Sequence, residues 1–223
     1  MKRIGLIASL LLVVAAPGVQ AGDDFQYWNT LEIVKRLTPK WDLFFRPEMR
    51  MRDDASDLFY HEYRQGVRYR PSKDLEIGLN YLFVRNQSTT GKITEEHTGE
   101  LDVTPKARLG PFDLSLRGRI ALRTIEHSAG EQEYQIRLMP RISTPTQIVG
   151  HKVTLYIADD LFYDTTRDAW NQNRVFVGLV VPLLDSNGVR VSSDFYYMHQ
   201  AVLGKRHDWS SNHILGIKLN VQF

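Results

Sequence analysis

The chain has 223 residues, of which 43% are hydrophobic and 11% aromatic, with a mean hydropathy of −0.32 and no cysteine. This composition is too apolar for a disordered chain, and the lack of cysteine excludes disulfides as a source of stability. After the first 21 residues, no segment approaches a run of about 18 apolar residues, which excludes transmembrane helices there.

The first 21 residues have the pattern of a cleaved secretory signal peptide. Lys2 and Arg3 precede a short apolar run at positions 4–16, and Val19-Gln20-Ala21 is a small-residue cleavage site. The run is too short for a spanning helix, and an uncleaved anchor is the alternative. Without Lys2 and Arg3 the 28 Lys and Arg residues fall to 26, equal to the 26 Asp and Glu residues. This balance gives no sign of nucleic-acid binding. We expect residues 22–223 to form one domain.

Eleven segments with strand-like alternation follow in chain order. Residues 25–37 alternate weakly, whereas residues 41–52, 59–70 and 75–85 alternate clearly. A polar loop leads to residues 95–109, and Gly110-Pro111 turns the chain into residues 112–123, the clearest strand. Shorter segments follow at 133–141, 152–161 and 173–181. Asn187-Gly188 is a strong hairpin signal before residues 189–199, and residues 211–223 end the chain.

The final segment has one apolar face, which carries Leu215, Ile217, Leu219, Val221 and Phe223. Chain termini usually fray, but the last strand of a transmembrane barrel must pair because lipid tolerates no open sheet edge. The segment resembles the C-terminal signature of Gram-negative outer-membrane β-barrels, which close on Phe. We therefore expect Phe223 to act as an assembly signal.

The connections alternate between tight turns and longer polar loops, as in bacterial barrels with short periplasmic turns. The sequence predicts an all-β, antiparallel up-and-down transmembrane β-barrel of about 10–12 strands in the outer membrane. Bacterial barrels have even strand numbers, so eleven segments leave the role of residues 25–37 open. A soluble exported β-sandwich or lipocalin-like barrel is the alternative fold.

If the apolar faces meet lipid, the opposite faces line a charged lumen. Simple hairpin registers set Glu32 opposite Arg46 and Arg36 opposite Asp42, and likewise Arg108 opposite Asp113 and Asp102 opposite Arg119. A basic wall beside an acidic wall would produce a field across an aqueous pore, whereas a sealed salt-bridge network would conduct nothing. The predicted lumen-lining residues are Arg46, Glu48, Arg50, Glu62, Arg64, Arg68, Glu96, Glu100, Asp102, Arg117, Arg119, Arg123, Arg137 and Arg141.

Aromatic residues gather at the predicted strand ends, where interfacial girdles explain them and sugar-stacking platforms are the alternative. They are Trp41, Tyr69, Phe112 and Phe223 near the tight turns, and Phe59, Tyr60, Phe83, Phe162, Tyr163, Trp170, Tyr197 and Trp209 near the loops.

No H-E-x-x-H, Walker A or G-x-S-x-G motif occurs. The nearest approach to acid–base chemistry is His127-Ser128 and His97, in or beside predicted loops. The loop acids Asp160, Asp164 and Asp168 could bind a hard cation, but an ordinary solvated loop explains them. We expect no catalytic residue, cofactor or metal.

The mature chain resembles a family of bacterial outer-membrane barrels known only as a domain of unknown function. The resemblance lies in Phe25-Gln-Tyr-Trp28, Leu37-Thr-Pro-Lys-Trp41, Glu48 with Arg50 and Arg52, Tyr63-Arg-Gln-Gly-Val-Arg-Tyr69, Gly78-Leu-Asn-Tyr81 and the terminal Phe. It implies a fold and a location but no catalytic residues. In outline the chain is also similar to small oligosaccharide-selective channels.

Three functions remain open: a passive or solute-selective channel, a non-conducting structural or docking barrel, and an outer-membrane lipid enzyme. The first is favoured. The expected partners are the lipid bilayer, the barrel assembly machinery and small polar or anionic solutes.

Overall fold

The computed structural model describes residues 24–126, 132–204 and 208–223, so the predicted signal peptide and His127-Ser128 lie outside the described residues. Among the residues described, no helix is long and apolar enough to cross a membrane. The described chain forms eleven strands: β1 (Asp24–Arg36), β2 (Trp41–Arg52), β3 (Asp57–Ser72), β4 (Leu75–Gln87), β5 (Ile93–Leu109), β6 (Phe112–Ile125), β7 (Gln132–Ile148), β8 (His151–Asp164), β9 (Ala169–Ser186), β10 (Val189–Leu203) and β11 (Trp209–Gln222).

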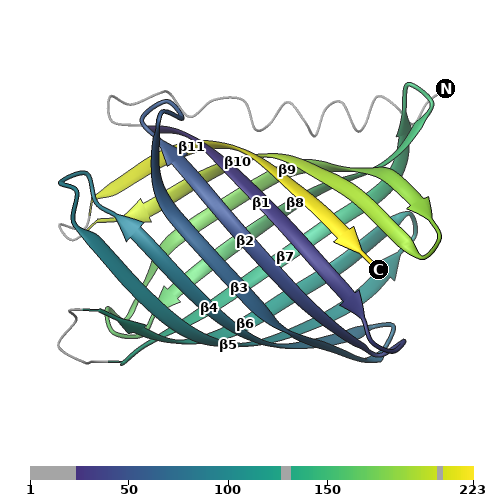
Figure 1. Cartoon of the computed structure of the whole chain (residues 1–223), viewed down its shortest axis with the longest axis horizontal. Coiled ribbons are helices and arrows are strands. Elements are labelled where there is room, and N and C mark those ends of the chain that lie inside the picture. The colour runs from purple at the N-terminus through teal and green to yellow at the C-terminus, as the bar shows by residue number, and fades with distance from the viewer. Residues whose placement is uncertain (1–23, 127–131, 205–207) are drawn as a thin grey trace.

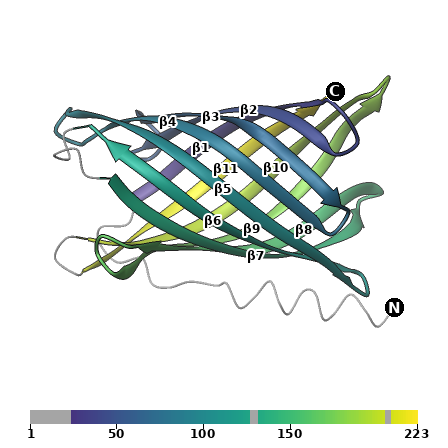
Figure 2. The same cartoon turned by 90° about the horizontal axis from the view of Figure 1, so that it is seen from below.

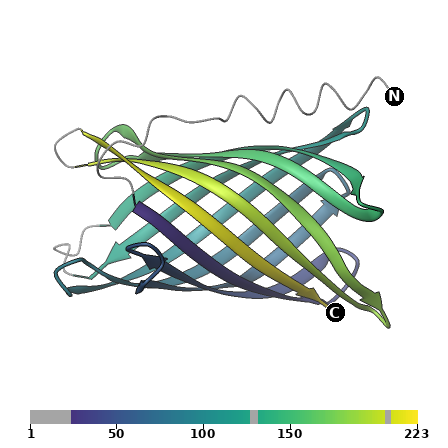
Figure 3. The same cartoon turned by 90° about the horizontal axis from the view of Figure 1, so that it is seen from above.

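The strands close into one barrel (Figures 1 and 2). Each strand pairs antiparallel with its neighbours in sequence, and β1 closes the ring by pairing parallel with β11 (Figure 3, purple beside yellow). The all-β barrel is therefore confirmed, with one parallel seam that the up-and-down prediction did not contain. Of residues 25–37, whose role the sequence left open, all but Leu37 belong to the wall strand β1.

Side chains alternate between the two faces of the wall, as the pleat of a strand requires, except where four of the strand pairs shift register. On β1 the buried residues are Gln26, Trp28, Thr30, Glu32 and Val34. The opposite faces of the strands are exposed and largely apolar, and they carry, among others, Leu43, Phe45, Leu79, Leu101, Leu116, Ile120, Ile142, Phe195 and Leu215. The barrel thus has a polar inside and an apolar outside.

The connections differ between the two ends of the barrel. Two-residue turns at 73–74, 110–111, 149–150 and 187–188 join strands at one end, which we call the short-turn end. The opposite, long-loop end carries connections such as 53–56, 88–92 and 165–168. Asn187 and Gly188 have positive φ angles of 53° and 79°, so the predicted Asn-Gly hairpin is confirmed.

Several strands are longer than their sequence patterns predict. β7 continues to Ile148 and β9 runs from Ala169 to Ser186, because Pro145 and Pro182 lie within strands instead of ending them. Proline keeps a φ compatible with extended backbone and removes only one donor from the ladder. At Pro182 the pairing of β9 with β10 also shifts register, as at a bulge.

Two interior glycines make room for tyrosine rings. Gly178 pairs with Tyr156, and Gly216 pairs with Tyr196, in adjacent strands. A Cβ atom at Gly178 would lie 2.6 Å from Tyr156 Cζ, and one at Gly216 would lie 2.0 Å from Tyr196 Cζ. The rings therefore lie flat across neighbouring strands, which holds them against the wall.

Phe223 completes the seam. Its backbone N–H donates to the carbonyl of Val34 at 3.0 Å, and its own carbonyl accepts from the N–H of Arg36 at 2.8 Å. The Nζ of Lys35 lies 4.8 Å from the centre of the Phe223 ring. The last residue of the chain is thus bonded to the first strand.

Candidate functional site: the barrel interior

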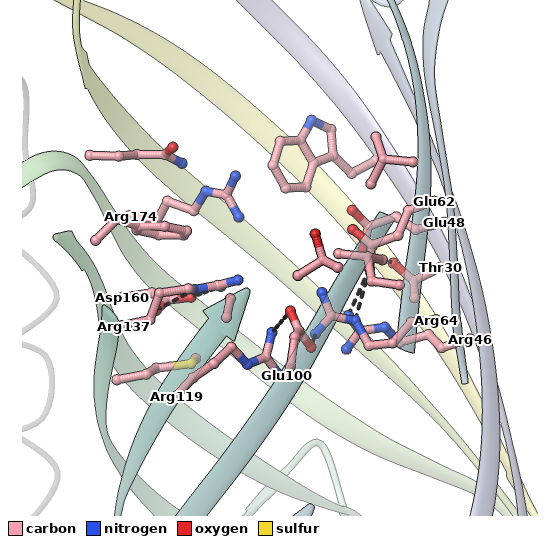
Figure 4. Close-up of a pocket in the computed structure, with 18 of the residues that line it drawn as sticks. Thr30, Arg46, Glu48, Glu62, Arg64, Glu100, Arg119, Arg137, Asp160 and Arg174 are labelled. Carbon is pink, nitrogen blue, oxygen red and sulfur yellow. Dashed lines mark hydrogen bonds and ion pairs between the residues drawn. The ribbon is translucent and has the colours of Figure 1, made fainter. Parts of the chain in front are cut away.

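A cavity of about 520 Å³ occupies the barrel interior, and side chains from all eleven strands line it. Figure 4 shows some of these residues, among them Glu62, Glu100 and Arg119. Twelve of the fourteen predicted lumen residues line this cavity: Arg46, Glu48, Arg50, Glu62, Arg64, Glu96, Glu100, Arg117, Arg119, Arg123, Arg137 and Arg141. The other two, Arg68 and Asp102, are not among the lining residues and form ion pairs with Glu32 and Arg119.

The predicted cross-strand registers occur in the structure. Arg36 lies opposite Asp42, and their side chains approach to 3.6 Å. Arg108 lies opposite Asp113 at 3.3 Å. Asp102 lies opposite Arg119, which donates two hydrogen bonds to it, of 2.6 and 2.7 Å. Glu32 does not pair with Arg46 and instead accepts from Arg68 and Lys218.

A network of paired charges covers the wall from β2 to β6. Glu62 accepts from Arg46 and Arg64 at 3.0 Å each, and Arg64 also contacts Glu100. Glu100 in turn accepts from Arg119 at 2.9 Å. Glu62, Arg64, Glu100 and Arg119 are all buried, whereas Arg46 is partly exposed. The acids and bases of this wall are therefore matched.

The wall from β6 to β9 has more bases than acids. Arg117 and Arg137 share the single carboxylate of Asp160. Among the described residues, Arg141 and Arg174 form no ion pair. Their guanidinium groups instead stack on aromatic rings: Arg141 on Tyr156 at 3.7 Å, and Arg174 between Phe162 and Trp28 at 4.8 and 5.0 Å.

The basic and acidic strands of the predicted transverse field are neighbours. Arg119 and Arg123 on β6 pair directly with Glu100, Asp102 and Glu96 on β5. These charges cancel along the wall, so they do not form opposite sides of a pore. The charge asymmetry comes instead from the surplus on β7 to β9. In total the cavity lining holds ten basic and six acidic side chains.

Arg50 marks the boundary between the charged wall and an apolar one. Its guanidinium lies 3.7 Å from the ring centres of both Trp28 and Tyr60 and donates to Glu48 at 2.7 Å. Trp28 in turn packs in a buried cluster with Met198 and Ile214. The interior therefore has a small apolar cluster beside the charged wall.

A second cavity of about 420 Å³ lies at the short-turn end of β5, β6 and β7. Its lining is Lys73, Asp74, Lys106, Ala107, Arg108, Asp113, Leu114, Ser115, Arg141 and Ser143.

Several sequence-based assignments were wrong. Asp160 and Asp164 belong to β8 and are buried inside the barrel, where Asp160 neutralises arginines, so they do not form a loop cation site with Asp168. Tyr60 and Phe162 line the cavity and do not belong to an interfacial girdle.

His97 faces outward, and its Nδ1 lies 2.5 Å from the Tyr81 hydroxyl. Within the described ranges, no group of three or more His, Cys, Asp or Glu residues could hold a metal ion.

Arg174, Asp160, Asp194 and Lys218 are interior charges that the sequence prediction did not include. For Lys218 and Asp194 the alternation of their strands was a usable signal. For Arg174 it was not, because β9 is apolar on both faces over Val175–Val181 and gives no inside–outside pattern.

Together the fold and its interior define a closed β-barrel with an apolar outer face and a positively biased central cavity. The chain belongs to the family described as "Protein of unknown function (DUF2490)", whose model matches residues 25–211. The search of curated proteins gives no match. Among solved structures, the chain is similar to the beta domain of the Bordetella autotransporter BrkA, with 13% identity and a TM-score of 0.39 over 79% of this chain and 82% of that one.

Proposed function

We propose that the protein is a narrow outer-membrane channel for small anionic solutes. The outward-facing residues support insertion into a bilayer, because a band of exposed Leu, Ile, Val and Phe side chains surrounds the barrel. On β5, for example, the outward residues from Gly99 to Leu109 span about 25 Å of membrane height at the usual strand tilt, as an outer-membrane barrel needs.

The observation that carries the channel proposal is the arrangement of the ion pairs. Among the described residues, every ion pair between strands joins strands at most two positions apart around the barrel, as in Arg64–Glu100 and Arg117–Asp160. The paired side chains therefore lie along the wall, and none of these pairs crosses the cavity. A salt-bridge network that sealed the interior would instead include pairs that reach across it.

Anion preference follows from the charge of the lining. Its ten basic side chains outnumber six acidic ones, and Arg141 and Arg174 have no carboxylate partner among the described residues. Rings or clusters of Arg and Lys in a pore favour anions.

The test is to reconstitute purified protein in planar bilayers and to measure the reversal potential under a KCl gradient. We expect conductance with a chloride preference, and a smaller preference in Arg174→Gln. Arg190→Gln is the matched control, because Arg190 is exposed and lines neither cavity. A cation preference in the wild type would contradict the proposal.

A non-conducting barrel with a role in envelope structure or docking is the second candidate. The density of buried pairs on β2 to β6 favours it, because small barrels can be filled by their own side chains. Protein that migrates as a folded barrel in unheated gel samples, yet gives no conductance, would establish this alternative over the channel.

A further inference from the structure

Arg141 lies where the two cavities meet. Among the described residues, it alone lines both the central cavity and the cavity at the short-turn end. A solute that moves between the central cavity and the short-turn end along this wall therefore passes its guanidinium group.

The Arg141 side chain is oriented by a ring and forms no ion pair among the described residues. Its guanidinium lies 3.7 Å from the centre of the Tyr156 ring. Stacking occupies the flat face of a guanidinium and leaves its N–H donors at the edges. Among the described residues, no carboxylate pairs with Arg141, so these donors remain available.

The platform under Arg141 is itself fixed. The Tyr156 hydroxyl donates to Asp194 at 2.9 Å, and the ring lies across Gly178, where a Cβ atom would collide with it. Since two independent contacts hold the ring, the stacked guanidinium is held at a defined place on the wall. A preorganised guanidinium binds carboxylates and phosphates through paired hydrogen bonds.

Basic residues continue on both sides of Arg141. Arg137 and Arg174 lie in the central cavity, and Lys73 and Lys106 line the second cavity. Lys106 is paired with Glu76 at 3.0 Å. An anion thus meets basic groups before and after Arg141.

From this geometry we infer that Arg141 is the specificity-determining residue of the channel and binds the carboxylate or phosphate group of the permeating solute. This inference rests on the proposed channel function. It goes beyond general anion preference, because it places a binding site at one side chain.

The experiment measures block of the KCl current by citrate and by pyrophosphate, which represent the two anion types. The measured quantity is the blocker concentration that halves the current. In Arg141→Ala we expect this concentration to rise about tenfold or more for at least one of the two anions, because the anion loses a charged hydrogen-bond partner. Arg141→Lys keeps the positive charge but loses the planar guanidinium group. Tyr156→Leu keeps the arginine but removes the aromatic ring on which it stacks. Both should give intermediate values, and Arg190→Ala should leave block unchanged.

The outcomes separate the two proposals. A wild-type barrel that does not conduct overturns the channel and the Arg141 site together. A conducting, anion-preferring wild type whose block by both anions is unchanged in Arg141→Ala overturns only the Arg141 site. If Arg141→Ala fails to assemble, the same comparison is made with Arg141→Lys and Tyr156→Leu, and unchanged block in both overturns the site. A rise for only one blocker supports the site and identifies the anion type.

Discussion

Replacing Glu100 by glutamine should lower the free energy of unfolding by about 3 kcal/mol, because it removes a buried charge shared by two buried arginines. The carboxylate contacts Arg64 and accepts from Arg119 at 2.9 Å, and all three side chains are at most 4% exposed. Breaking a buried pair costs about 3–5 kcal/mol. The lower end applies here because Arg64 keeps Glu62 at 3.0 Å and Arg119 keeps Asp102 at 2.6 Å.

The assay is unfolding in urea of protein reconstituted in detergent micelles, followed by tryptophan fluorescence. Glu76→Gln is the matched control, because the Glu76–Lys106 pair has side chains that are 24% and 38% exposed. Such a partly exposed pair contributes about 0–1 kcal/mol. Equal losses in the two variants would refute the reasoning, since the effect would not depend on burial.

Three further predictions test the faces, the end and the seam of the barrel. Leu116→Arg, on the outward face, should cost about 2–4 kcal/mol in urea unfolding, whereas Ser115→Arg should cost less than half as much, and the reverse order would mean a flipped register. Phe223→Ala should reduce the yield of heat-modifiable barrel on gels more than Trp209→Ala, an exposed aromatic at the other end of β11, and equal yields would contradict a special role for Phe223. Because the chain has no cysteine, Leu31→Cys with Leu219→Cys should form a disulfide across the parallel seam that shifts gel mobility, whereas Leu31→Cys with Leu215→Cys should not.

Alternation in the sequence was sufficient to predict the barrel, the inner faces of most strands and several pairings across hairpins. Arg36–Asp42 and Asp102–Arg119 follow from counting outward from a turn, since the register of a hairpin is fixed by its turn. Contacts between strands two positions apart cannot be counted in this way. The pairs Arg64–Glu100 and Arg117–Asp160 depend on the curvature of the closed wall and on side-chain length.

The prediction from sequence was less accurate at the end of β8. The predicted strand 152–161 ends three residues before β8 does, so Phe162 and Asp164 were placed in a loop, and Asp160 near its end was grouped with the loop acids, although all three are buried inside the barrel. Burial among arginines, which the sequence of β8 alone does not reveal, is what makes Asp160 a wall residue. Arg174 was missed for a different reason. The neighbouring residues of β9 are apolar on both faces, so they do not indicate which face of the strand is the inner one.

The odd strand number follows from what β1 contributes to both of its neighbours. Glu32 accepts from Arg68 on β3 at 3.0 Å and from Lys218 on β11 at 2.9 Å, so one buried carboxylate neutralises a base on each side of β1. Trp28 on the same face packs with Met198 and Ile214. A ten-stranded barrel in which β2 paired directly with β11 would have the even number usual in bacteria. It would also leave Arg68 and Lys218 without this acid and open the buried cluster. Burial of apolar side chains is the main favourable term in folding, so the cluster around Trp28, together with the two pairs of Glu32, favours the parallel seam over the even-numbered alternative.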